Sequence, residues 1–174
     1  MTDMSDKGIC YLVGAGPGDP GLVTLKAKEC VERADVVVYD ALSSPVILGW
    51  TKPGAEKVYV GKRAKDHALP QDKINELIVD RTRKGRVVVR LKGGDPMIFG
   101  RGGEEAAELA GAGVPFEIVP GISSAIGGPA YAGIPVTHRD HCSQLTLFTG
   151  HEDPTKEESS IDYARIAGAP GTKV

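Results

Sequence analysis

The sequence predicts an α/β fold, with an N-terminal parallel-sheet domain that carries helices on both faces and an incomplete second α/β domain after it. Three observations favour this fold class. Short apolar runs alternate with amphipathic helical segments, the runs are apolar throughout their length, and glycine-rich turns follow two of them. Strands of this kind are typical of parallel sheets, because helices bury both of their faces.

The expected elements alternate along the chain. Strands are expected at residues 9–13, 35–39, 58–60, 86–91, 116–119 and 145–149. Helices are expected at residues 24–33, 71–84, 103–112 and 123–132. Thr24 is a candidate N-cap for the first helix, and Gly85 is a candidate terminator for the second.

A domain boundary is expected near Val119, where the alternating pattern closes and Pro120-Gly121 follows. We expect residues 8–119 to form the N-terminal α/β domain and residues 120–174 to be part of a second α/β domain whose remainder is absent. About fifty residues are too few for a sheet-based domain of usual size. A small closing subdomain with a disordered tail is the alternative.

Composition narrows the possible functions. A net charge of -2 over 174 residues gives no global positive field for nucleic acid. No apolar run approaches the roughly 20 residues of a membrane helix, and residues 1–7 are polar, unlike a signal peptide. The widely spaced Cys10, Cys30 and Cys142 are typical of reduced thiols. We expect a cytoplasmic protein that binds neither nucleic acid nor membranes.

The first glycine-rich turn, residues 14–21, lies between a strand and a helix, where dinucleotide-binding enzymes carry their fingerprint. Asp40, at the end of the next strand, matches the place of a ribose-binding acid. However, Asp19 stands at the third glycine position, and Pro17 removes a backbone N–H. An NAD-dependent dehydrogenase is therefore the weaker hypothesis, from another enzyme class, and a tight turn is the purely structural one.

The second glycine-rich segment, residues 91–105, follows the clearest expected strand and favours a binding function. Glycines at the carboxyl end of a strand let a ligand approach the backbone, and open α/β sheets bind ligands at this edge. A third loop, residues 119–125, contains Ser123 and Ser124. Their hydroxyl groups could cap the following helix or contact polar ligand atoms.

Two smaller groups of residues carry less information. Residues 61–65 form a basic cluster, and most such clusters are solvated surface. Residues 137–142 read Thr-His-Arg-Asp-His-Cys, but these side chains are too close in sequence for the usual zinc spacing. We therefore expect no metal site.

Taken together, these segments resemble the tetrapyrrole methylase family. The matching segments are residues 13–19, 25–27, 39–42, 61–63, 71–75, 89–96, 99–102, 119–122 and 133–139. The stretch from residue 90 to 105 is specific, whereas the first glycine turn alone is not. Within the family, the Gly-Lys-Arg and Leu-Lys-Gly-Gly-Asp-Pro segments are similar to enzymes that act on uroporphyrinogen III, and a methylase of a later precorrin is the alternative.

The resemblance implies a two-domain enzyme with S-adenosyl-methionine bound in a cleft between the domains, a homodimer, and a chain that continues past residue 174. The implied reaction is two successive C-methylations of uroporphyrinogen III, giving precorrin-2 for sirohaem and cobalamin biosynthesis and releasing S-adenosyl-homocysteine. A chain that stops at residue 174 could be inactive by itself.

The resemblance also implies roles for single residues. Asp40 and Lys62 match positions with acid–base roles. Asp95 is a candidate for steadying the sulfonium charge. Because the substrate is a polycarboxylate, Arg63, Arg101 and Arg139 are expected to bind it through charge-assisted hydrogen bonds. The implied donor contacts are Pro17, Gly93, Gly94, Asp95, Ile98, Ser123, where many relatives have threonine, and Ser124.

Overall fold

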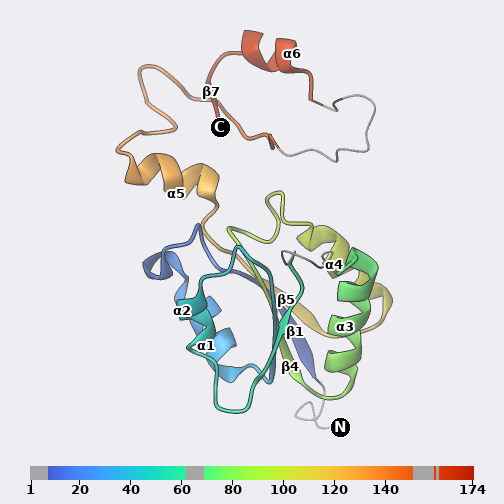
Figure 1. The fold of residues 1–174 in the computed structure, drawn as a ribbon. Coiled ribbons are helices and arrows are strands. Elements are labelled where there is room, and N and C mark those ends of the chain that lie inside the picture. Colours follow the sequence, from blue (N-terminus) through green and yellow to red (C-terminus); the bar gives the residue numbers. More distant parts are fainter. Residues whose placement is uncertain (1–7, 62–68, 151–158, 160) are drawn as a thin grey trace, which may run out of the picture. The chain divides into compact units, whose positions relative to one another are not determined.

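Figure 1 shows a computed structural model of the chain, which describes residues 8–61, 69–150, 159 and 161–174. The chain divides into two compact units, residues 1–123 and residues 124–174. The first unit contains the predicted parallel sheet. The second contains two short helices and a two-stranded sheet.

A five-stranded parallel sheet forms the centre of the first unit. Every neighbouring pair of its strands is parallel, and Val13 of one strand lies opposite both Leu91 and Val119. The predicted strands are confirmed, with ends that differ by one or two residues. The strands lie in the order β3-β2-β4-β1-β5, with bounds β1 (Ile9–Gly14), β2 (Val36–Tyr39), β3 (Glu56–Tyr59), β4 (Val87–Lys92) and β5 (Phe116–Val119).

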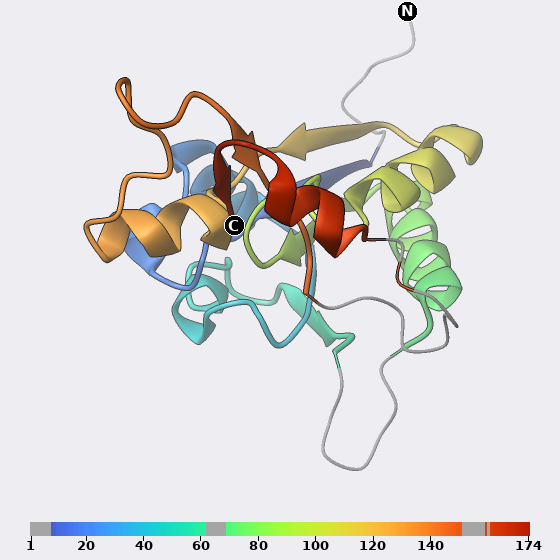
Figure 2. The same cartoon turned by 90° about the horizontal axis from the view of Figure 1, so that it is seen from above.

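Helices cover both faces of this sheet, as predicted. Helices α1 (Leu25–Arg33) and α2 (Pro45–Leu48) pack on one face, where Val37 and Val89 point. Helices α3 (Gln71–Arg83) and α4 (Gly102–Gly111) pack on the other (Figure 1 and Figure 2). Apolar residues on both faces of each strand explain the continuous apolar runs in the sequence.

The helix ends follow local sequence signals. Thr24 caps α1, because its Oγ1 accepts a hydrogen bond of 3.1 Å from the amide of Ala27. Gly85 follows α3 with a φ of +76°, a conformation that glycine adopts without steric strain. The 3-10 turn η2 (Pro20–Leu22) and helix α2 were not predicted, because elements of three or four residues show no periodicity.

The second unit contains α5 (Ser124–Tyr131), β6 (Leu145–Thr146), α6 (Tyr163–Gly168) and β7 (Thr172–Lys173). Strands β6 and β7 pair in parallel. Helix α5 confirms the predicted helix, while β6 is shorter than predicted and α6 was not predicted. Among the described helices, none combines the length and apolar character needed to cross a bilayer.

The three cysteines are free thiols, and two of them belong to the core. Cys10 and Cys30 are buried on opposite faces of the sheet. Burial, with a smaller contribution from Glu105, raises the pKa of the Cys10 thiol to about 12. This thiol therefore stays protonated and unreactive near neutral pH.

Candidate active site

Two neighbouring strands send the chain in opposite directions, and this defines a binding edge. After β1 the chain crosses through α1 to β2, whereas after β4 it crosses through α4, on the other face, to β5. In open parallel sheets, the crevice beyond the carboxyl ends of two such strands is where ligands bind. Both predicted glycine-rich segments follow these strands, so the structure brings them to this edge.

The turns at this edge meet main chain to main chain. The amide of Gly16 donates to the carbonyl of Gly94 at 3.2 Å, and the amide of Gly94 donates to the carbonyl of Gly16 at 2.8 Å. A Cβ added to Gly121 would lie 2.3 Å from the carbonyl oxygen of Gly94, and one added to Gly14 would lie 2.6 Å from Cα of Gly121. No side chain fits at these two positions. We call Gly14, Gly16, Gly94 and Gly121 the glycine junction.

Asp95 braces the glycine junction. Its Oδ1 accepts a hydrogen bond of 2.8 Å from the amide of Met97, and its Oδ2 accepts one of 3.0 Å from the amide of Gly121. The carboxylate therefore ties the loop after β4 to the loop after β5. Its negative charge is held at the binding edge in a fixed position.

Six of the seven predicted donor-binding residues belong to the segments that meet at this edge. Gly94 has a φ of +65°, and the nearest neighbour to a Cβ built on it is Cα of Ser123, at 3.7 Å. A Cβ at this position would therefore make only ordinary van der Waals contact, so the backbone of Gly94 is not crowded by the described residues. The six residues are Pro17 in the turn after β1, Gly93, Gly94, Asp95 and Ile98 in the loop after β4, and Ser123 after β5.

Asp40 lies at the carboxyl end of β2, the neighbour of β4 in the sheet. It lines a cavity of about 490 Å³, where the rings of Tyr39 and Tyr59 meet edge to face with centroids 5.4 Å apart. The hydroxyl of Ser43, also in the wall, is buried without a hydrogen-bond partner among the described residues. This wall offers mostly apolar contacts and one carboxylate to a small ligand or to part of a larger one. The remaining lining residues are Ala41, Pro45 and Leu48.

A buried group of charges lies on the α3–α4 face of the sheet and contacts Asp40. Arg90 and Lys92 of β4 point to this face, and Glu105 of α4 is fully buried beside them. Oε1 of Glu105 accepts from Nε of Arg90 at 3.1 Å, from Nζ of Lys92 at 3.0 Å and from Nε2 of Gln71 at 3.1 Å. Arg90 also reaches Oδ2 of Asp40 at 3.4 Å. We call Arg90, Lys92 and Glu105 the buried charge cluster.

The sequence interpretation missed the buried charge cluster, although a signal was present. Arg90 and Lys92 are two residues apart in an otherwise apolar strand, so they point to the same face. Two cations on a covered face need a buried counter-charge. Burial and the nearby Arg90 lower the pKa of Lys92, while Glu105 favours its charged form.

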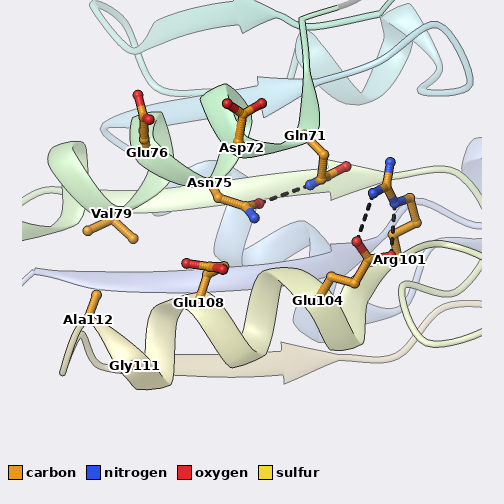
Figure 3. A pocket seen from close by; sticks show the side chains of 10 residues that line it. All are labelled: Gln71, Asp72, Asn75, Glu76, Val79, Arg101, Glu104, Glu108, Gly111 and Ala112. Atoms are coloured by element: carbon orange, nitrogen blue, oxygen red, sulfur yellow. Dashed lines mark hydrogen bonds and ion pairs between the residues drawn. The ribbon is translucent and has the colours of Figure 1, made fainter.

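A second cavity, of about 590 Å³, lies between α3 and α4 (Figure 3). Four carboxylates stand in its wall, and its single guanidinium, that of Arg101, is paired with Glu104 at 2.7 Å. A wall with this charge repels a polycarboxylate. The substrate role of Arg101 stays a prediction. The other three carboxylates belong to Asp72, Glu76 and Glu108.

For the remaining four predicted site residues the structure gives no position at this edge. Lys62 and Arg63 fall outside the described residues. Ser124 begins α5, and Arg139 is an exposed residue of the second unit. Within the described ranges, no three His, Cys, Asp or Glu side chains gather in the way a metal ion requires.

The fold and the edge define an α/β protein of the class that binds a small ligand at the carboxyl ends of a parallel sheet, with a second pocket beside it. The family model for tetrapyrrole (corrin/porphyrin) methylases matches residues 10–174. The chain belongs to this tetrapyrrole methylase family. This membership sets aside the dehydrogenase interpretation of the first glycine turn.

Two curated relatives cover nearly the whole chain. It is 56% identical over 167 residues to an S-adenosyl-L-methionine-dependent uroporphyrinogen III methyltransferase of Methanosarcina barkeri, covering 96% of this chain and 66% of that protein. It is 50% identical over 171 residues to a siroheme synthase of Yersinia pestis, covering 98% of this chain and 36% of that protein. The chain therefore spans less than two thirds of the length of either relative.

Solved structures show the same fold. A uroporphyrin-III C-methyltransferase from Thermus thermophilus has a TM-score of 0.74 and 49% identity, covering 83% of this chain and 61% of that one. A structure of the Thermus thermophilus enzyme complexed with S-adenosyl homocysteine has a TM-score of 0.66, with 45% identity over 80% of this chain and 54% of that one. A cobalt-precorrin-4 methyltransferase has a TM-score of 0.70 but 36% identity, over 80% of this chain and 56% of that one.

Proposed function

We propose that the protein carrying this chain is an S-adenosyl-methionine-dependent C-methyltransferase. It converts uroporphyrinogen III to precorrin-2 by two successive methylations, in sirohaem and cobalamin biosynthesis, and releases S-adenosyl-homocysteine. The observation that supports this most is the glycine junction braced by Asp95, which offers a main-chain edge without side chains at Gly14 and Gly121 and with one fixed negative charge. The higher identity to uroporphyrinogen methyltransferases than to the cobalt-precorrin-4 enzyme supports the acceptor.

The residues at the binding edge fit S-adenosyl-methionine. Its sulfonium supplies an already activated methyl group. A glycine at position 94 lets a nucleoside approach the main chain closely, and the carboxylate of Asp95 is a counter-charge for a cation. We assign the donor contacts to Pro17, Gly93, Gly94, Asp95, Ile98, Ser123 and Ser124.

We assign part of the tetrapyrrole to the cavity beside Asp40, whose wall is formed mainly by tyrosine and aliphatic side chains. Lys62, Arg63 and Arg139 receive its carboxylates through charge-assisted hydrogen bonds, and Arg101 does so by exchanging its partner Glu104 for the substrate. Local positive charge of this kind lets a chain with a net charge of -2 bind a polyanion.

Asp40 and Lys62 form the proposed acid–base pair. Charge builds on the macrocycle as its carbon is alkylated, and a proton must then leave. A carboxylate in the cavity wall can accept that proton. Holding the two substrates in line is worth about 7–11 kcal/mol of the barrier in well-oriented reactions.

The proposal extends to the whole protein. Residues 8–119 form the N-terminal domain, and residues 120–174 belong to a second domain that continues beyond residue 174, which the greater length of the relatives supports. The protein is a homodimer in the cytoplasm and binds neither nucleic acid nor membranes.

One assay tests donor, acceptor and reaction together. The longest natural protein that carries this chain is incubated anaerobically with uroporphyrinogen III and S-adenosyl-methionine, and the tetrapyrrole is analysed by mass spectrometry. We expect a product heavier by two methyl groups. If the folded protein binds S-adenosyl-homocysteine but leaves uroporphyrinogen III unmethylated, the proposed methyl donor stands and the proposed acceptor is wrong. A later precorrin would then be tested as the acceptor. If the folded protein neither methylates uroporphyrinogen III nor binds S-adenosyl-homocysteine, the proposal is wrong.

A further inference from the structure

We propose that Glu105 and Arg90 are positioning residues for Asp40. Buried Glu105 fixes the guanidinium of Arg90, and Arg90 in turn fixes the carboxylate of Asp40 in the cavity wall. The kinetic part of this inference rests on the proposed methyl transfer, whereas its thermodynamic part concerns only the folded chain.

The carboxylate of Asp40 is held from two sides. Its Oδ1 accepts a hydrogen bond of 3.1 Å from the amide of Leu42, and its Oδ2 faces the two terminal nitrogens of Arg90 at 3.4 and 3.5 Å. The side chain of Asp40 is 25% exposed, and the residue lines the cavity. Arg90 is therefore the cation that sets the direction of the reactive group without being exposed itself.

Arg90 is itself fixed by atoms that belong to three different elements. Its Nε donates to Oε1 of Glu105 in α4 at 3.1 Å, and its Nη1 donates to the carbonyl of Leu91 in β4 at 2.9 Å. The same nitrogen lies 3.5 Å from the carbonyl of Val38 in β2. A guanidinium is a rigid planar fork, so contacts on one edge determine where its other edge points.

Charge balance explains why Glu105 is needed. The buried charge cluster and Asp40 together contain two cations and two carboxylates. Without the charge of Glu105, Arg90 and Lys92 would be two buried cations facing Asp40 alone, and both would compete for it. Glu105 is fully buried and is not among the residues that line either described cavity, so it acts through Arg90.

The first test is a cycle of variants in the longest natural protein. Arg90→Gln is expected to lower kcat for methyl transfer about tenfold or more, with little change in KM for S-adenosyl-methionine. In the Asp40→Asn background the same change is expected to lower kcat by less than about twofold, because a residue that acts through Asp40 has nothing left to position. Equal losses in both backgrounds, or full activity of Asp40→Asn, would overturn the inference and leave the methyl-transfer function standing.

A second pair of variants tests whether a loss of activity comes from unbalanced charge or from any disruption of the core. Glu105→Gln is expected to lower kcat, and adding Lys92→Met is expected to restore most of the loss, because one cation and one carboxylate are then absent together. Glu108→Gln, an exposed change on the same helix, is the matched control and is expected to keep the wild-type kcat. A double variant no faster than Glu105→Gln would count against the charge argument.

A measurement without activity makes the two proposals independent. Urea unfolding midpoints are compared for wild type, Arg90→Gln, Asp40→Asn and the double variant. Contact between the two side chains predicts that the shifts are not additive, and additive shifts would overturn the inference even if no methyl transfer is found. If Arg90→Gln fails to fold, Arg90→Lys, which keeps the buried positive charge, is used in its place in the kinetic cycle and in the unfolding cycle.

Discussion

At the scale of single residues, neighbouring carboxylates of α4 face opposite environments. Glu105 is fully buried and accepts hydrogen bonds from two cations, whereas Glu104 pairs with Arg101 at the surface. A surface pair of this kind contributes at most about 1 kcal/mol, because water and salt screen it. A buried ion pair adds little net stability, because burying its charges costs free energy. Removing one partner is strongly destabilising, because the other charge is then left buried without a counter-charge.

Glu105→Gln is expected to lower the free energy of unfolding by about 3–5 kcal/mol, because it leaves the two buried cations Arg90 and Lys92 with Asp40 as their only nearby carboxylate among the described residues. Equilibrium urea denaturation measures this change. Glu108→Gln, three residues further along the same helix and exposed, is expected to stay within about 0.5 kcal/mol of wild type. A similar small change for Glu105→Gln would show that the cluster is hydrated or able to rearrange.

Gly121→Ala is expected to weaken S-adenosyl-homocysteine binding by about tenfold or more, because its Cβ would lie 2.3 Å from the carbonyl of Gly94 and displace the edge. Isothermal titration calorimetry on the longest natural protein measures the affinity. Gly103→Ala is the control: this position is helical and has no atom within 4 Å of the added Cβ among the described residues. Alanine there is expected to stabilise the helix by about 1 kcal/mol and leave binding unchanged.

At the scale of elements, Asp35 ties the start of β2 to β4. Its Oδ2 accepts from the amide of Val87 at 2.8 Å, and its Oδ1 pairs with Lys52 at 2.6 Å. Lys52 and the amide of Val87 hold the pKa of Asp35 below its usual range. Because the folded pKa is lowered, this stabilisation is complete above the unfolded pKa of about 3.9 and is lost as pH falls through the folded pKa.

Wild-type stability is therefore expected to fall more steeply with acidification than that of Asp35→Asn. The difference in stability between the two proteins is expected to change from about pH 5 down to below the ordinary aspartate pKa of about 3.9. Urea midpoints recorded across this range give the two slopes. Parallel slopes would mean that solvent screening has removed the effect, since the side chain of Asp35 is 25% exposed.

The sequence predicted elements better than their arrangement. Strands such as β2 were predictable because β-branched residues run without a break, and α1 was predictable because Thr24 caps it. The strand order β3-β2-β4-β1-β5 was not, because local sequence does not say which strands are neighbours. The glycine turns were predictable because their signal lies in consecutive residues. The contact of Arg90 with Glu105 was not, because it depends on how α4 packs against β4.

At the scale of the whole molecule, the chain forms one unit with a complete sheet and a second, smaller one. Its relatives extend well beyond the matched region, since the chain covers 66% of the Methanosarcina barkeri protein and 61% of the Thermus thermophilus enzyme. The proposed cleft between two domains would therefore take residues from outside the matched region.

A polypeptide of residues 1–174 is expected to fold but to transfer no methyl group, while the longest natural protein transfers two. Circular dichroism checks folding, and mass spectrometry of the tetrapyrrole checks turnover under identical conditions. Equal rates for the two proteins would mean that the two units described here already make a complete active site.

The glycine junction has a consequence for how such a protein can change over generations. Its glycines contact one another through main-chain atoms, and a methyl group has no room at Gly14 or Gly121. A substitution at these glycines would disrupt the edge and would not give it a new shape. The cavity beside Asp40 is built from side chains, so each substitution there alters its shape or polarity by a small step. New acceptor preferences should therefore arise, or be selected in the laboratory, at residues such as Tyr39, Leu48 and Tyr59, while the edge beside them stays as it is.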